Sequence, residues 1–171
     1  MPEPENTGLP YNAPLRLHEA EVLPEWVDYN GHMSEAFYVL VFGHSTDALL
    51  NYIGMDAEYR ERSRCSLYTL EAHVSYVREA REAEPLHVTT QLLDHDHKRA
   101  HLFHSMYHAT DRRLLATGEV MMLNVDNTEP AGPRSAPFSE EISSTLKGIK
   151  ASHDSLPLPE QAGRAIGIER R

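Results

Sequence analysis

The chain has 171 residues, of which 40% are hydrophobic and 25% charged, and its formal net charge is −10. This length and balance predict one globular domain with a substantial core. The acidic charge argues against a general nucleic-acid binder, which needs a basic surface, and no apolar run reaches the length of a membrane span.

The single cysteine, Cys65, excludes an intramolecular disulfide framework, so a reducing cytoplasm is the simplest setting. The N-terminal sequence MPEPENTGLPYNAP is acidic and contains several prolines, unlike a secretory signal peptide. We therefore expect a cytoplasmic protein with no membrane association, in which residues 1–13 form a polar lead before the domain.

The first predicted strand covers residues 15–23, where apolar and polar residues roughly alternate before Pro24. The longest helical pattern follows within residues 26–54. Its apolar residues recur at a helical period on more than one face, so we expect a largely buried helix. Gly54 suits the left-handed residue that ends a helix. Gly43 costs about 1 kcal/mol relative to alanine and marks either a close backbone approach or a restart of the helix.

Strands dominate the sequence after the charged residues 55–65, which predict a loop or a short helical turn. Turn residues recur between four stretches rich in β-branched and aromatic residues, and this favours an antiparallel meander. Gly118, inside the last stretch, indicates a bulge or a bend. The four predicted strands cover residues 66–77, 86–96, 100–109 and 114–125.

A second helix is predicted over residues 140–151, with Ser139 as its N-cap. Residues 152–171 contain prolines and glycines and form either a tail or an arm that binds a partner. The whole pattern is α+β, with one buried helix against one antiparallel sheet in a domain covering residues 14–151. Because such a sheet has an unpaired edge, a dimer that continues the sheet is a natural hypothesis.

A polar turn, Val27–His32, lies directly before the long helix and carries Asp28, Asn30 and His32. These groups stand beside the positive end of the helix dipole, where anions and developing oxyanions are stabilised. The same residue types also build ordinary turns, since aspartate is common at helix entries and asparagine before glycine is a frequent turn pair.

The residues from Asp28 to Met33, with the helix after them, resemble hotdog-fold acyl-CoA thioesterases of the 4-hydroxybenzoyl-CoA thioesterase type. That family pattern is Asp-x-x-Gly-(His or apolar)-(Val or Met)-Asn with an aromatic residue shortly after it, here Tyr38. The likeness covers residues 14–150. It is closer still to the betainyl-CoA thioesterases of carnitine breakdown, which share DYNGHM and FGHSTDALLNYIGM. Ser34 departs from the asparagine found in many relatives.

The resemblance implies a sheet wrapped around the long helix, a homodimer or a dimer of dimers, and active sites at the dimer interface. It also implies that Asp28 is the catalytic carboxylate. The family needs no metal and no cofactor, because coenzyme A is part of the substrate. A short acyl-CoA, with betainyl-CoA as the first choice, is therefore the expected small-molecule partner.

Thioester hydrolysis needs an activated water or an attacking carboxylate, and a donor for the carbonyl oxygen. Asp28 can act as general base or as nucleophile, and the sequence leaves both open. Backbone N–H groups at the helix start, near Ser34 and Glu35, can polarise the carbonyl. Asn30 and His32 either position the reacting groups or only form the turn, while Gly31 allows a tight backbone path beside the substrate.

A quaternary ammonium group calls for aromatic faces and a carboxylate. Trp26, Tyr29 and Tyr38 cluster around the turn and are candidates for such a cage, although ordinary packing explains them as well. Glu71 and His73 lie two apart on a predicted strand and so share a face. They either line the pocket of a partner chain or face solvent.

The phosphates of coenzyme A need cations, and the candidates are Arg78 and Arg81 after one strand and Lys98 and Arg99 at a hairpin. Each is also explained as a solvated surface residue. No metal site is expected from the histidines, because they lack a ligand motif and alternate across a strand. Cys65 lacks a catalytic motif. The histidines concerned are His95, His97, His101, His104 and His108.

Two other functions remain open from the sequence. A hotdog hydratase or dehydratase resembles Asp-x-Asn-Pro-x-His, but here histidine follows Asp28 by four residues rather than five, and Gly31 replaces the proline. A non-catalytic module that binds acyl-CoA or a quaternary amine would show binding without turnover.

Overall fold

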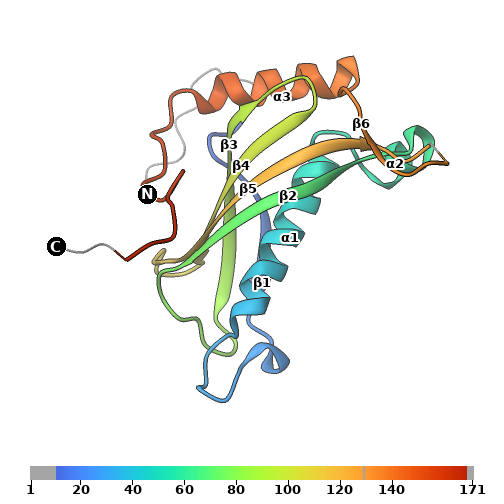
Figure 1. Cartoon of the computed structure of the whole chain (residues 1–171). Helices are drawn as coiled ribbons and strands as arrows, with labels where there is room; N and C mark the ends of the chain where they lie inside the picture. Colours follow the sequence, from blue (N-terminus) through green and yellow to red (C-terminus); the bar gives the residue numbers. More distant parts are fainter. Residues whose placement is uncertain (1–10, 129, 169–171) are drawn as a thin grey trace.

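The structure, a computed structural model, describes residues 11–128 and 130–168 (Figure 1). Most of the predicted N-terminal lead therefore lies outside the described residues. The strands are β1 (Leu15–Glu21), β2 (Cys65–Tyr76), β3 (Pro85–His95), β4 (Arg99–His108), β5 (Leu114–Asp126) and the short β6 (Arg134–Ser135). The helices are the single-turn η1 (Pro24–Trp26), α1 (Glu35–Tyr52), α2 (Ala57–Ser63) and α3 (Glu140–His153).

The α+β hotdog fold is confirmed, but its strand order differs from a simple meander. Strands β3, β4 and β5 are consecutive neighbours, whereas β2 pairs with β5 and β1 pairs with β3, giving the antiparallel order β1-β3-β4-β5-β2. Alternation along one strand identifies its buried face but not its partner, so the sequence could not reveal this crossover. As a result, β2 forms a free edge of the sheet.

Helix α1 lies across the concave face of the curved sheet, as Figure 1 shows. Phe42 of α1 packs directly over Gly118 of β5, where a Cβ atom would lie only 2.9 Å from the phenylalanine ring. Of the two alternatives predicted for Gly118, a bulge or a bend, the bulge is wrong, since this residue pairs in register with His104 and Val74. The glycine is instead explained by the close approach of α1.

His104 on β4 is fully buried beside this contact, with its ring stacked on Phe42 at 5.9 Å between centroids. Its Nδ1 lies 2.9 Å from the Thr90 hydroxyl and its Nε2 lies 3.1 Å from the Thr46 hydroxyl. Because Thr46 donates to the Phe42 carbonyl (3.1 Å), its oxygen is free to accept from Nε2–H. Burial lowers the pKa of His104 to about 4, so a neutral imidazole joins α1 to β3 and β4.

The other end of α1 is closed by Gly54 and α3. Gly54 has φ +90°, the left-handed conformation expected at the end of the helix. The Ser139 hydroxyl accepts the Ile142 N–H (3.3 Å) and caps α3 as predicted. Ile142, Leu146 and Ile149 then pack into the same core as Leu49 and Ile53 of α1.

Helix α3 continues past the predicted residue 151 to His153, whose buried ring joins two other segments. Nδ1 accepts the Leu92 N–H (2.9 Å), and Nε2 donates to the Asn12 carbonyl (3.0 Å). The chain after α3 reaches the outer face of the sheet, the face away from α1 that carries His101 and Glu119. There the Gly163 N–H donates to a Glu119 carboxylate oxygen (2.8 Å).

One strip of α1 remains open, contrary to the expectation of a largely buried helix. Val39 is 49% exposed and Leu40 is 41% exposed. They line a groove of about 630 Å³ between α1 and β2, which begins at Ala36 and passes Gly43 and Leu67. Within the part of the chain that the structure describes, no helix is long and apolar enough to cross a membrane.

Two glycine substitutions test the docking of α1. Gly118→Ala should lower the free energy of unfolding by about 1–3 kcal/mol, because the added methyl group overlaps a buried ring. Gly43→Ala is the matched control, since its Cβ meets nothing within 4 Å, and it should gain up to about 1 kcal/mol from helix propensity. Urea denaturation measures both. If Gly118→Ala were no less stable than Gly43→Ala, the packing argument would be contradicted.

Candidate active site

The polar turn, residues 27–32, is a tight hydrogen-bonded loop before α1. Val27 and Met33 form an isolated bridge at its base, the Asp28 N–H donates to the His32 carbonyl (2.9 Å), and the Gly31 N–H donates to the Asp28 carbonyl (2.9 Å). Gly31 has φ +77°, which side chains rarely adopt, so a glycine is favoured there.

The Asp28 carboxylate uses one oxygen to shape the turn and keeps the other available. Oδ1 accepts the Asn30 N–H (2.7 Å), as in an ordinary Asx turn. Within residues 11–128 and 130–168, Oδ2 has no hydrogen-bond partner. The turn is open to solvent: Asn30 is exposed and Tyr29 is 97% exposed. The structural role of Asp28 is therefore real and is compatible with a chemical one.

The start of α1 offers free backbone donors. The first N–H groups of an α-helix have no carbonyl partner within the helix, and the hydroxyl of the N-cap residue Ser34 caps none of them. Ser34 thus occupies the N-cap position without a side-chain capping hydrogen bond. Glu35 is the first helical residue, and its acidic side chain is exposed. The N–H groups of Glu35 and Ala36 can therefore polarise a carbonyl oxygen.

Two of the three predicted cage aromatics belong to the core. Trp26 is 9% exposed and stacks on Phe37 with ring centroids 5.4 Å apart. Tyr38 is 3% exposed, and its hydroxyl accepts the Ala80 N–H (3.0 Å) and contacts the Arg78 carbonyl (3.4 Å). Only Tyr29 of the three presents an open ring, so these residues do not form a cage within one protomer.

Glu71 and His73 share a face, as expected, but it is the outer face of the sheet. The register of β2 shifts between Thr69 and Glu71, so the alternation that directs Leu67 toward α1 is reversed beyond the shift. Both side chains line a cavity of about 280 Å³ on that face, together with His101, Glu119 and Arg164.

The segment 77–84, between β2 and β3, lies against the polar turn, a contact that the sequence did not reveal. The Met33 N–H donates to the Ala80 carbonyl (2.8 Å), and His32 Nε2 lies 3.7 Å from a Glu79 carboxylate oxygen. Arg78 and Arg81 line a cavity of about 440 Å³ beside this contact. Arg78 donates to the Leu114 carbonyl (3.0 Å), whereas the Arg81 side chain has no partner among the described residues.

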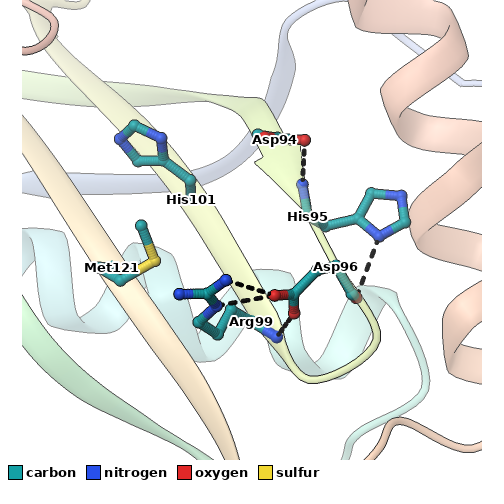
Figure 2. Close-up of a pocket in the computed structure, with 6 residues that line it drawn as sticks. All are labelled: Asp94, His95, Asp96, Arg99, His101 and Met121. Atoms are coloured by element: carbon teal, nitrogen blue, oxygen red, sulfur yellow. Dashed lines mark hydrogen bonds and ion pairs between the residues drawn. The ribbon is translucent and has the colours of Figure 1, made fainter.

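Lys98 and Arg99 lie at the opposite end of the sheet from the polar turn, in the β3–β4 hairpin (Figure 1). Asp96 holds this hairpin by accepting the backbone N–H groups of Lys98 and Arg99 and the Arg99 side chain (2.7 Å). Figure 2 shows the contacts with Arg99. These hydrogen bonds hold the pKa of the Asp96 carboxyl far below its usual range. The Lys98 ammonium contacts the Ser135 hydroxyl (3.3 Å).

The strand histidines point in different directions. His101 lies on the outer face and pairs with Glu119 (2.7 Å), His104 is in the core, and His108 pairs with Asp111 (3.2 Å). His101 and His104 thus lie on opposite faces, as predicted. Among the described residues, no three histidine, cysteine, aspartate or glutamate side chains are arranged to hold a metal ion. Burial raises the pKa of the Cys65 thiol, which disfavours its use as a nucleophile.

Comparisons with known proteins agree with this geometry. Residues 22–146 match the family model described as the thioesterase-like superfamily. A betainyl-CoA thioesterase of Pseudomonas aeruginosa is 46% identical over 154 residues, which cover 90% of this chain and 95% of the relative. An L-carnitine dehydrogenase/betainyl-CoA thioesterase of Rhizobium meliloti is 43% identical over 95% of this chain, which spans only 32% of that longer protein.

A solved structure has the same fold. A hypothetical protein from Staphylococcus aureus, in complex with CoA, superposes with a TM-score of 0.83 at 29% identity, covering 93% of this chain and 99% of that one. The matched residues include the polar turn, α1 and the four long strands β2, β3, β4 and β5, whereas β1 ends just before the match begins. The chain therefore belongs to the thioesterase-like superfamily and has its hotdog fold.

Proposed function

We propose that this protein hydrolyses betainyl-CoA to glycine betaine and coenzyme A. The observation that carries the proposal is the free Asp28 oxygen in a turn beside the unpartnered N–H groups of α1. The 46% identity to a betainyl-CoA thioesterase over 95% of its length supports both the reaction and the acyl group. The same identity favours hydrolysis over hydration of an enoyl-CoA and over binding without turnover.

Asp28 can supply the reaction in either of two ways. As a general base, Oδ2 takes a proton from a water molecule that attacks the thioester carbon. As a nucleophile, it attacks that carbon directly and forms a mixed anhydride, which water then cleaves. In both paths the C–S bond breaks, the sulfur leaves as the thiolate of coenzyme A, and the N–H groups of α1 stabilise the oxyanion. Asn30 and His32 would hold the turn and the substrate in position.

Asp28→Asn tests the role of the carboxylate. The amide oxygen can still accept the Asn30 N–H, so the turn and the free energy of unfolding should change little. The rate constant kcat for thiol release from betainyl-CoA should fall about 10²–10⁴-fold. Retained turnover would remove Asp28 from the mechanism. In a single turnover in ¹⁸O-water, label in the Asp28 carboxylate would establish the nucleophilic path, because water that cleaves the anhydride at the Asp28 carbonyl carbon leaves its oxygen there.

The phosphates of coenzyme A are proposed to bind at Arg78 and Arg81 rather than at the hairpin. Arg81 has an unpaired guanidinium within the described residues and follows Ala80, which contacts the polar turn. The Arg78 guanidinium has further N–H donors besides the one that is bonded to the Leu114 carbonyl. Lys98 and Arg99 already have partners and lie at the far end of the sheet of their own protomer. They remain candidates only for a site on a partner chain.

Inhibition by free coenzyme A distinguishes these two cationic sites. Arg81→Ala should weaken inhibition about 5- to 30-fold through loss of a charge-assisted hydrogen bond, while inhibition by pantetheine, which has no phosphate, should not change. Lys98→Ala serves as the matched control and should leave both inhibition constants as they are. If only Lys98→Ala weakened inhibition by coenzyme A, the phosphates would be assigned to the hairpin instead.

A homodimer joined along β2 is the proposed assembly. β2 is one of the two edge strands of the sheet, the other being β1, and it carries the exposed apolar residues Tyr68 and Leu70, the latter 58% exposed. Pairing two such edges would satisfy the unpaired backbone groups and bury these side chains. The expected cytoplasmic location, and the division into a domain over residues 14–151 and a separate tail, stay predictions.

Sedimentation velocity tests the dimer. The protein should sediment with the mass of two chains, and Leu70→Lys should shift it toward the monomer by placing two charges at the proposed interface. Leu158→Lys is the control, because Leu158 is an exposed apolar residue (70%) away from β2. A monomer at micromolar concentration, or equal dissociation by both variants, would contradict an interface at β2; the mass of four chains would indicate a dimer of dimers.

A further inference from the structure

A betainyl thioester fixes the distance between its positive charge and its reacting carbon. One methylene group separates the ammonium nitrogen from the carbonyl carbon, so the two atoms lie about 2.5 Å apart. If the first N–H groups of α1 bind the carbonyl oxygen, the groups that recognise the cation must also lie at the start of α1. Glu71 and His73 lie on the outer face and do not meet this requirement within one protomer. Trp26 and Tyr38 lie near the start of α1, but their side chains are buried.

Tyr76, the last residue of β2, does meet it. Its hydroxyl donates to the carbonyl of Glu35, the first residue of α1, at 3.3 Å. Its ring packs edge-on against Tyr38, with centroids 5.4 Å apart. These two contacts fix the ring in place, and yet the residue remains 50% exposed. Tyr76 is therefore an aromatic side chain that is fixed at the start of α1 and still has solvent-exposed surface.

Glu35 provides the negative charge beside this ring. Its side chain is exposed, and no hydrogen bond or ion pair engages its carboxylate within the described part of the chain. The carboxylate lies close enough to act on the tyrosine: burial first, and the charge of Glu35 second, raise the pKa of the Tyr76 hydroxyl. Val39, one helical turn further on, is 49% exposed and adds apolar surface that can contact N-methyl groups.

We propose that Tyr76 and Glu35 bind the trimethylammonium group of the acyl chain and so determine substrate specificity. The aromatic face attracts a cation through its quadrupole, and the carboxylate adds a direct charge interaction. This inference rests on the proposed function, because it assumes a betainyl substrate whose carbonyl is bound at the start of α1. Neither residue is assigned a part in bond breaking.

A neutral isostere of the substrate isolates the effect of the charge. In 3,3-dimethylbutyryl-CoA a carbon atom replaces the nitrogen, so the shape is kept and the charge is lost. Tyr76→Leu should lower kcat/KM for betainyl-CoA about 3- to 30-fold and change the value for the isostere less than twofold. Glu35→Gln should act in the same selective way. Tyr76→Phe keeps the ring and loses only the hydroxyl, so it should retain most of the preference.

Tyr52→Leu is the matched control for the loss of a tyrosine, since Tyr52 is 43% exposed and is the last residue of α1, at the opposite end from the polar turn. It should leave the ratio of the two kcat/KM values unchanged, and urea denaturation shows whether each variant is folded. If the wild-type protein prefers betainyl-CoA and folded Tyr76→Leu keeps that preference, the proposed cation site is wrong. If the wild-type protein does not prefer betainyl-CoA over the neutral isostere, the proposed betainyl substrate is wrong, and the proposed cation site is wrong as well.

Discussion

The contact of Phe42 with Gly118 fixes where α1 lies on the sheet, and the geometry of the polar turn depends on it. A glycine at this point lets the helix approach the backbone of β5, while the neutral imidazole of His104 joins the helix to two neighbouring strands. Both contacts are short and buried, so they tolerate little displacement. The start of α1 is thereby held beside the end of β2 and the segment 77–84.

The polar turn gives Asp28 a structural role and also leaves it available for the proposed chemistry. One oxygen of Asp28 closes the turn, and the other stays open at the helix start. Ser34 stands at the N-cap without capping, which leaves backbone donors unpaired. Replacing a functional cap typically costs about 1 kcal/mol of stability, and in the proposed mechanism the substrate oxygen supplies the acceptor that Ser34 does not provide.

Local patterns predicted the local features of this protein well. The period of apolar residues located α1 and the five long strands to within a few residues, and Gly54 marked the helix end, because these signals depend on neighbours in sequence. The motif at Asp28 identified the family. The partner of β2 could not be predicted, since pairing joins residues far apart in the chain, and the reason for Gly118 became clear only when Phe42 was seen above it.

The candidate site was harder to predict for the same reason. Trp26 and Tyr38 are aromatic residues of the kind that form a cation cage, but their side chains are buried. A register shift in β2 turns Glu71 and His73 away from α1. Tyr76 and Arg81 belong to no recognisable sequence motif. They lie near the start of α1 only because the strand crossover brings the end of β2 and segment 77–84 there. Composition can suggest a cage or an anion site, whereas long-range topology decides which side chains are available to build it.

The ring of His153 has a further consequence for how this domain can be combined with others. It joins Asn12, before the first strand, to Leu92 and the end of α3, so the segments that enter and leave the core meet at one imidazole. Tyr11, next to Asn12, packs against Tyr52 at the C-terminal end of α1, with ring centroids 6.2 Å apart, whereas the polar turn precedes the N-terminal end of this helix, which is about 27 Å long. A module tethered at this junction would leave the polar turn unobstructed. This modular geometry is compatible with the longer Rhizobium meliloti relative, of which this fold spans about one third.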